Sequence, residues 1–106
     1  MSKIIYNNQF YCKNEFSISL ENRAFLYGDG LFESVKVFNG RAFNLDAHLN
    51  RMFEGAKFLN LDLRMRKEDM QNQINLLLKE NSISDAAYLK IMVFRSEGGK
   101  YLAENN

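Results

Sequence analysis

The sequence predicts an α+β fold in which two helices pack on one face of an antiparallel sheet, forming a two-layer sandwich. Strand-like runs are closed by the turn pairs Asn7-Asn8 and Asn39-Gly40, two stretches of helical periodicity follow, and an alternating run ends the pattern. Strands with segregated helices are typical of this class. The length of 106 residues, without a linker or a low-complexity segment, fits a single domain covering residues 1–106.

The first half of the sequence predicts two β-hairpins. Asn7-Asn8 separates residues 4–6 from residues 9–12, and asparagine tolerates the left-handed backbone of a tight turn. Residues 31–38 alternate and end at Asn39-Gly40, the strongest short-range hairpin signal. The alternation assigns the side chains of this strand to two faces, with Leu31, Glu33, Val35 and Val37 on one face and Phe32, Ser34, Lys36 and Phe38 on the other.

From residue 44 the periodicity becomes helical. Apolar residues recur at steps of three and four over residues 45–59, and Asn44 or Asp46 could cap the start of this helix. A second helix is predicted to begin near Lys67 and to stop at Asn81. The apolar stripes of the two helices consist of Leu45, Leu49, Met52, Ala56 and Leu59 in the first and of Met70, Ile74, Leu77 and Leu78 in the second.

The last periodic segment, residues 88–95, alternates again and predicts a strand, with Leu89, Ile91 and Val93 on one face. The glycine-containing residues 96–101 read as a loop. Residues 101–106 carry no sequence signal of a domain end. We therefore expect the chain to be a truncated part of a longer protein.

Composition excludes several classes of function. The net charge of +1 comes from 14 basic and 13 acidic residues that are mixed along the chain, which argues against a nucleic-acid partner. Cys12 has no partner for an internal disulfide, and no zinc-type spacing exists, so we expect a cytoplasmic protein without a structural metal. No apolar run reaches the length of a membrane span or a signal peptide, so membrane insertion and secretion are disfavoured.

A few charged residues could carry chemistry. Glu33 lies on an otherwise apolar strand face, where a carboxylate needs a partner or a pocket. His48 and Arg51 project on the same side of the first helix, and a guanidinium suits phosphate or carboxylate, although a solvated arginine would show the same spacing. Lys36 and Lys90 lie in the middle of strands, so they line a cleft or their sheet face is exposed to water.

Taken together, these residues resemble a known family. The segment from Tyr27 to Glu33 (Tyr-Gly-Asp-Gly-Leu-Phe-Glu), the strand that ends at Asn39-Gly40, and His48-x-x-Arg51 closely resemble the N-terminal domain of class IV aminotransferases, the fold-type IV pyridoxal phosphate enzymes. The resemblance covers nearly the whole chain, from the first hairpin to residue 101. It implies the fold of that N-terminal domain.

The resemblance also implies roles for single residues. Arg51 would bind the phosphate of pyridoxal 5'-phosphate. Phe32 and Glu33 would border the substrate cleft, and Tyr27 would reach the active site of a neighbouring subunit. Lys90 and Lys100 would hold the carboxylates of a small amino-acid or keto-acid substrate. Such enzymes are usually dimers with shared sites, so a homodimer or a larger assembly is expected.

The resemblance leaves the reaction open between an aminotransferase and a lyase. Residues 88–101 look like the basic strand and Gly-Gly loop of aminodeoxychorismate lyases, but Ser96 and Lys100 depart from the lyase pattern. Branched-chain aminotransferases carry a cation at the position of Lys90. D-amino acid aminotransferases resemble residues 31–51, but their Arg-x-His pattern is missing here.

No lysine of this chain lies in a segment that resembles the family's Schiff-base lysine motif, which belongs to the C-terminal domain. We therefore expect no catalytic residue in these 106 residues and no covalent cofactor bond, so that the chain alone is inactive while its parent is an enzyme. The alternative is a stand-alone degenerate module that binds or dimerises without enzyme activity.

Overall fold

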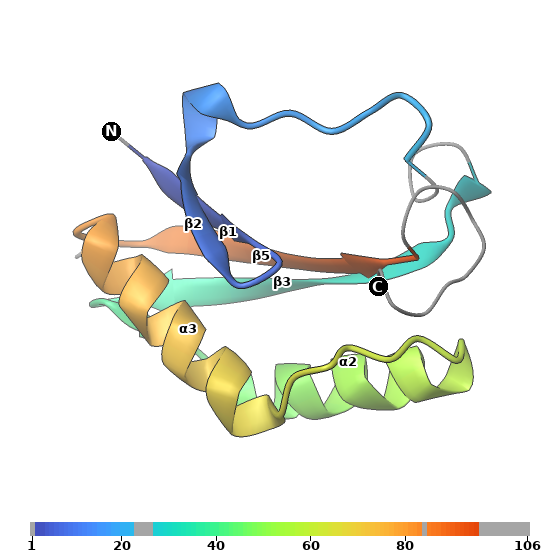
Figure 1. The fold of residues 1–106 in the computed structure, drawn as a ribbon. Helices are drawn as coiled ribbons and strands as arrows, with labels where there is room; N and C mark the ends of the chain where they lie inside the picture. Colours follow the sequence, from blue (N-terminus) through green and yellow to red (C-terminus); the bar gives the residue numbers. More distant parts are fainter. Residues whose placement is uncertain (1, 23–26, 84, 96–106) are drawn as a thin grey trace.

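The computed structural model describes residues 2–22, 27–83 and 85–95, and its strands and helices follow the predicted order (Figure 1). Within these ranges, no helix is long and apolar enough to cross a bilayer. The elements are β1 (Lys3–Tyr6), β2 (Gln9–Cys12), a short 3₁₀-helix η1 (Lys13–Glu15), β3 (Gly30–Phe38), β4 (Arg41–Ala42), α2 (Leu45–Phe58), α3 (Lys67–Glu80) and β5 (Ala87–Phe94).

The central sheet has the strand order β4-β3-β5, and both pairings are antiparallel. β3 pairs with β5 from Gly30↔Phe94 to Val37↔Ala87. β3 and β4 form the hairpin that Asn39-Gly40 predicts, and both turn residues have the positive φ of a type I′ turn, 54° and 76°. Both helices lie on the same side of this sheet in Figure 1, so the predicted two-layer α+β arrangement is confirmed.

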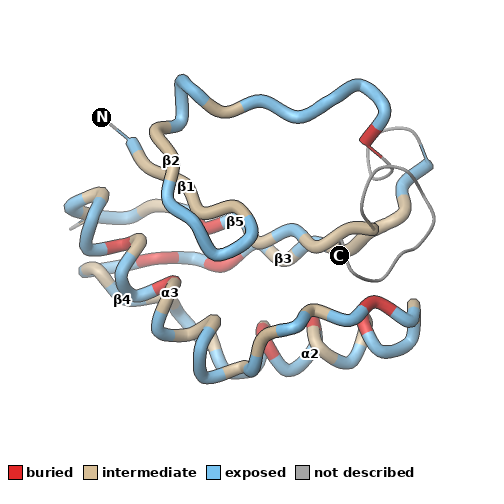
Figure 2. Tube along the Cα trace, in the orientation of Figure 1, coloured by how far each residue is buried: buried red, intermediate tan, exposed pale blue. Residues whose placement is uncertain are grey.

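The core lies between the sheet and the two helices. Figure 2 shows the buried segments of β3 and of the helices facing one another. The predicted alternation of β3 is confirmed, because Val35 and Val37 are both 0% exposed. Burial of each such side chain contributes roughly 1.5–3 kcal/mol. The buried cluster consists of Val35 and Val37 of β3, Leu49 of α2, Ile74 and Leu78 of α3, and Leu89 of β5.

The opposite face of the sheet is exposed in the part of the chain that the structure describes. It carries large apolar side chains and the lysines of the two long strands. Phe32 is 60% exposed, Tyr88 78% and Met92 52%, values far above those of the core residues on the same strands. Among the described residues, the two helices therefore cover only one face of the sheet.

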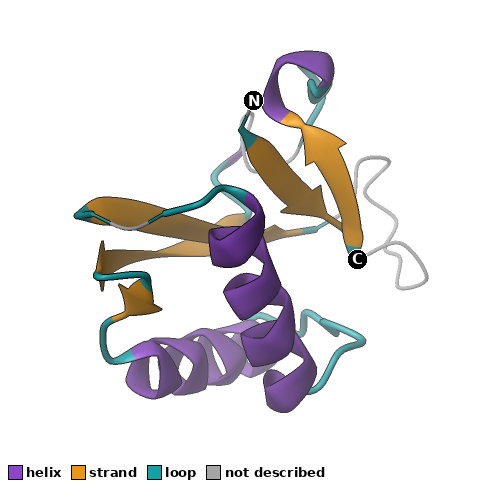
Figure 3. Ribbon diagram, turned by 90° about the vertical axis from the view of Figure 1, so that its left-hand side faces the viewer, coloured by secondary structure: helices purple, strands orange, loops and turns teal. Residues whose placement is uncertain are grey.

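The β1–β2 hairpin is a separate two-stranded sheet (Figure 3). Its predicted turn is confirmed, since Asn7 and Asn8 have φ angles of 49° and 73°. The side chain of Asn81, which ends α3 as predicted, links the hairpin to the helix. Its Oδ1 accepts a hydrogen bond from Lys3 N (2.6 Å), and its Nδ2 donates to Lys3 O (3.0 Å) and to Leu77 O (3.1 Å).

Local details differ from the sequence prediction. Asn44 precedes α2, but neither it nor Asp46 caps the helix through its side chain. Asn44 has a left-handed backbone (φ 54°), and the Asp46 carboxylate is bound by Lys67 Nζ of α3 at 2.6 Å. Asn44 therefore holds the predicted N-cap position, but the side-chain hydrogen bond expected of a cap is missing, and the Asp46 carboxylate takes part in a contact between the helices instead. The predicted loop at residues 96–101 lies outside the described residues.

Candidate functional site

The candidate site begins with a cluster of Glu33, His48 and Arg51. The alternation of β3 turns Glu33 toward the helices, and one turn of α2 presents His48 and Arg51 to it. Arg51 binds the carboxylate with two hydrogen bonds, Nε to Oε2 at 2.9 Å and Nη2 to Oε1 at 2.8 Å. His48 Nδ1 lies 2.6 Å from the same Oε1. The partner that Glu33 was predicted to need is therefore this pair of basic side chains.

The cluster holds an ionised pair at neutral pH. The hydrogen bonds from Arg51 lower the pKa of Glu33 to about 2, burial acts in the opposite direction, and the His48 hydrogen bond lowers the pKa further. The Glu33 hydrogen bonds also raise the pKa of Arg51. The Glu33 side chain is only 11% exposed, so its charge sits in a sheltered position with a matched counter-ion.

The Arg51 guanidinium keeps donors beyond those that Glu33 uses. Glu33 takes the edge formed by Nε and Nη2, while Nη1 donates no hydrogen bond within the described ranges. The Arg51 side chain is 69% exposed. Arginine has five donors in a planar fork. Arg51 can therefore stay bound to Glu33 and still present its second edge to an anion.

A second group lies on the exposed face of the sheet. Lys90 Nζ is 4.8 Å from the centroid of the Phe32 ring, within the range of a cation–π contact. Phe32 and Glu33 are neighbours in sequence, yet they lie on opposite faces of β3 because the strand alternates. The structure thus brings Glu33 together with Arg51, and Phe32 together with Lys90.

Two predicted site residues remain, Tyr27 and Lys100. Tyr27 lies just before β3 and is 68% exposed. Lys100 lies outside the described residues.

Sequence reasoning missed the role of Arg95. Its Nε donates to Asp29 Oδ2 at 3.1 Å, and its Nη2 donates to the carbonyl oxygen of Leu59 at 2.8 Å. The contact joins the end of β5, the approach to β3 and the end of α2. The sequence indicates Asp29 only as part of a glycine-containing turn. An acid and a base 66 residues apart carry no local signal of pairing.

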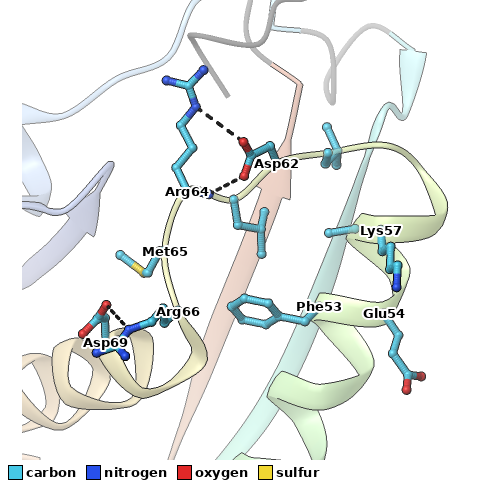
Figure 4. Close-up of a pocket in the computed structure, with 11 residues that line it drawn as sticks. Phe53, Glu54, Lys57, Asp62, Arg64, Met65, Arg66 and Asp69 are labelled. Atoms are coloured by element: carbon cyan, nitrogen blue, oxygen red, sulfur yellow. Dashed lines mark hydrogen bonds and ion pairs between the residues drawn. The ribbon is translucent and has the colours of Figure 1, made fainter.

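A cavity of about 630 Å³ lies elsewhere, between the end of α2 and the start of α3 (Figure 4). Arg64 and Arg66 line it, but each has an acidic neighbour, Asp62 at 3.9 Å and Asp69 at 3.5 Å. Glu33 and Arg51 do not line this cavity. We place the candidate site at the Glu33–Arg51 cluster on the basis of its chemistry.

Comparison with known proteins identifies the family. The model of the amino-transferase class IV family matches residues 30–106. The chain belongs to this family. Class IV aminotransferases depend on pyridoxal phosphate, and the matched segment includes β3 and α2, which hold Glu33 and Arg51.

Two curated relatives of this class IV chain are aminotransferases. A putative branched-chain-amino-acid aminotransferase of Methanocaldococcus jannaschii is 33% identical over 96 residues, which cover 91% of this chain and 33% of that protein. A D-alanine aminotransferase of Staphylococcus haemolyticus is 32% identical over 85 residues, covering 80% of this chain and 30% of that protein. The chain therefore spans about a third of the length of these relatives.

A solved structure supports the fold. The branched-chain aminotransferase of the thermophilic archaeon Thermoproteus uzoniensis, crystallised with norvaline, matches with a TM-score of 0.83 at 19% identity. The match covers 95% of this chain and 35% of that chain. The expected fold of a fold-type IV aminotransferase, corresponding to its N-terminal domain, is confirmed.

Proposed function

We propose that this chain is the part of a pyridoxal phosphate-dependent class IV aminotransferase that holds the cofactor phosphate and the substrate carboxylate. Arg51 is the proposed phosphate ligand. The observation that carries the proposal is the division of its guanidinium, with one edge bound by Glu33 and the other side exposed.

The residues present suit a phosphate group. Arginine matches phosphate with a planar fork of donors, and such charge-assisted bonds are stronger than neutral ones. Glu33 orients Arg51 before any ligand arrives, so less side-chain freedom is lost on binding. His48 holds the same carboxylate oxygen from the side and so helps to fix its position. The cluster therefore acts as a prearranged anion anchor.

Pyridoxal phosphate, when bound, supplies an electron sink for chemistry at the α-carbon of an amino acid. The described residues bind and orient in this proposal, while the covalent lysine comes from outside these 106 residues. We expect no turnover by the chain alone. Transamination is favoured over a lyase reaction because both relatives named above are aminotransferases.

The proposed substrate side is the exposed sheet face. Lys90 would attract a carboxylate, and Phe32 holds its ammonium group in place through the cation–π contact. Tyr27 and Lys100 are proposed to complete the contacts to an amino-acid or keto-acid substrate, with Tyr27 serving a neighbouring subunit of a homodimer. Glu33 lies on the opposite face of β3, where it binds Arg51. We therefore propose that Glu33 contributes to substrate binding only indirectly.

Titration of pyridoxal 5'-phosphate into the chain tests the role of Arg51, with phosphate-free pyridoxal as the comparison ligand. The intact chain should bind the phosphate form roughly ten- to a hundredfold more tightly, the range expected for hydrogen bonds to a charged group. Arg51→Met should abolish this preference. Arg66→Met is the matched control, because Arg66 is also exposed and also paired with an acid.

Two results would contradict the proposal. The first is an equal loss of preference in Arg66→Met, which would show nonspecific attraction of the anion. The second is a folded chain without any preference for the phosphate form. That result would support the alternative of a degenerate module without cofactor binding.

The substrate role of Lys90 has a separate test. Titration with 4-methylvaleric acid should shift the NMR signals of Lys90 and Phe32 at neutral pH, and Lys90→Met should remove the shifts. Lys36→Met is the control, since Lys36 is exposed on the same sheet face. Equal responses of the two variants would rule out a specific role for Lys90.

A further inference from the structure

α2 lies antiparallel along β3 on the helix side of the sheet (Figure 1). Leu31 of β3 lies against Gly55 of α2. Two residues further along the strand, Glu33 binds Arg51, which is one helical turn before Gly55. Two residues of a strand advance by about 6.6 Å and four residues of a helix by about 6.0 Å, so the two contacts are direct neighbours. The Leu31–Gly55 contact therefore sets the spacing of helix and strand beside the ion pair.

The strand side of Gly55 has little room for a side chain. A Cβ at this position would lie 3.0 Å from Cδ1 of Leu31 and 3.4 Å from its Cδ2. The first distance is shorter than the separation of about 3.5–4.0 Å that is usual between carbon atoms in contact. The backbone of α2 at Gly55 therefore packs directly on the Leu31 side chain.

The backbone conformation of Gly55 does not itself call for glycine. Gly55 is helical, its φ is not in the left-handed region, and its carbonyl oxygen accepts a hydrogen bond from Leu59 N at 3.0 Å. In a helix, glycine is less favourable than alanine, because it loses more backbone freedom on folding. The feature that a side chain would disturb at this position is the close approach of α2 to β3.

A long side chain at position 55 would affect Arg51. Side chains on a helix lean toward its N-terminus, so each one covers the surface over the turn before its own Cα. A long side chain at position 55 would therefore extend from Leu31 toward Arg51, and would either push α2 away from β3 or fill the space beside the guanidinium. In both cases the hydrogen bonds of 2.9 and 2.8 Å from Arg51 to Glu33 would be lengthened or lost.

We propose that Gly55 is a positioning residue of the anion anchor, because it lets α2 approach β3 closely enough for Glu33 to hold Arg51 in place. The inference rests on the proposed function of Arg51. A methyl group at position 55 should be tolerated, since only the ends of the flexible Leu31 side chain need to move. A side chain of the size of leucine should not be tolerated.

Two measurements test the proposal: the pKa of Glu33, and the preference of the chain for pyridoxal 5'-phosphate over pyridoxal. Gly55→Ala should leave the pKa of Glu33 at about 2. Gly55→Leu should raise this pKa by about one pH unit or more and reduce the preference about tenfold, because the Arg51 hydrogen bonds are the largest cause of the low pKa. Gly55→Val adds less bulk and replaces Gly55→Leu if that variant does not fold. Ala47→Leu is the matched control, because Ala47 is a small, exposed residue of the same helix.

A compensating pair of substitutions separates positioning from stability. The double variant Leu31→Ala/Gly55→Leu exchanges the sizes of the two partners and roughly conserves the packed volume. It should restore both the low pKa of Glu33 and the preference for the phosphate form. A merely less stable protein would keep the low pKa in its folded fraction.

Three results would overturn the proposal. The first is a folded Gly55→Leu or Gly55→Val chain that keeps both properties of the intact chain. The second is an equal loss in Ala47→Leu, and the third is a folded double variant that keeps the raised pKa of Glu33. If Gly55→Leu raises this pKa while the intact chain has no preference for the phosphate form, the positioning by Gly55 is supported and only the proposed function of Arg51 is contradicted.

Discussion

Replacing Arg51 by methionine is expected to raise the pKa of the Glu33 carboxyl from about 2 toward its ordinary value of 4.5. The hydrogen bonds from Arg51 are the largest influence on this pKa, burial opposes them, and the His48 hydrogen bond is next. Methionine fills similar space without donors. Without Arg51, burial raises the pKa of Glu33 and the His48 hydrogen bond lowers it. The pKa should therefore move most of the way from about 2 to 4.5.

The pKa of Glu33 can be followed by ¹³C NMR of its carboxyl carbon, with Arg66→Met as the control. The stability linkage has a definite sign. A carboxyl whose pKa is lowered on folding adds stability that is fully present above 4.5 and is lost as the pH falls toward about 2. The urea midpoint of the intact chain should therefore fall across this window more steeply than that of Arg51→Met. This difference between the two proteins should become smaller at higher salt concentration, because the Arg51 side chain is largely exposed and its charge is screened.

Two observations would refute this reasoning. A Glu33 carboxyl that titrates near 4.5 in the intact chain would mean that Arg51 does not hold it in solution. A pKa that stays near 2 in Arg51→Met would assign the effect to another group.

Two further predictions concern the framework around the site. Gly30→Ala should destabilise the chain by about 1–3 kcal/mol and lower its melting temperature by at least about 4 °C, since the added Cβ would lie 2.5 Å from the carbonyl oxygen of Val93. Calorimetry checks this value, and an unchanged melting temperature would contradict the close strand packing. Asn81→Ala should release the hairpin and speed exchange of the Lys3 amide by tenfold or more, because both of its side-chain bonds to Lys3 are lost. Unchanged exchange would show that other contacts hold β1.

Local chemistry made much of the fold predictable. Asn39-Gly40 specified its turn through backbone conformation, and the alternation of β3 assigned Val35 and Val37 to the core. The same alternation also assigned Phe32 and Glu33 to opposite faces of the strand, as the structure has them.

Contacts between distant residues were not predictable from sequence. Asn81 binds Lys3 across 78 residues, and Arg95 binds Asp29 across 66. Neither pair has a spacing that a helix or strand would impose. For Glu33, polarity showed that a partner was needed, and helical spacing grouped His48 with Arg51. Only the packing of α2 on β3 in the structure shows that His48 and Arg51 are the partners of Glu33.

The pairing of β3 with β5 affects the order in which the chain can fold during synthesis. Phe94 is synthesised 64 residues after its partner Gly30. At a synthesis rate of about 5–20 residues per second, β3 therefore lacks its partner strand β5 for roughly 3–13 s. β4 and both helices emerge during that interval. The apolar face of β3 can thus pack on α2 before its second edge is paired. Formation of the Glu33–Arg51 contact, which needs only β3 and α2, can precede completion of the sheet.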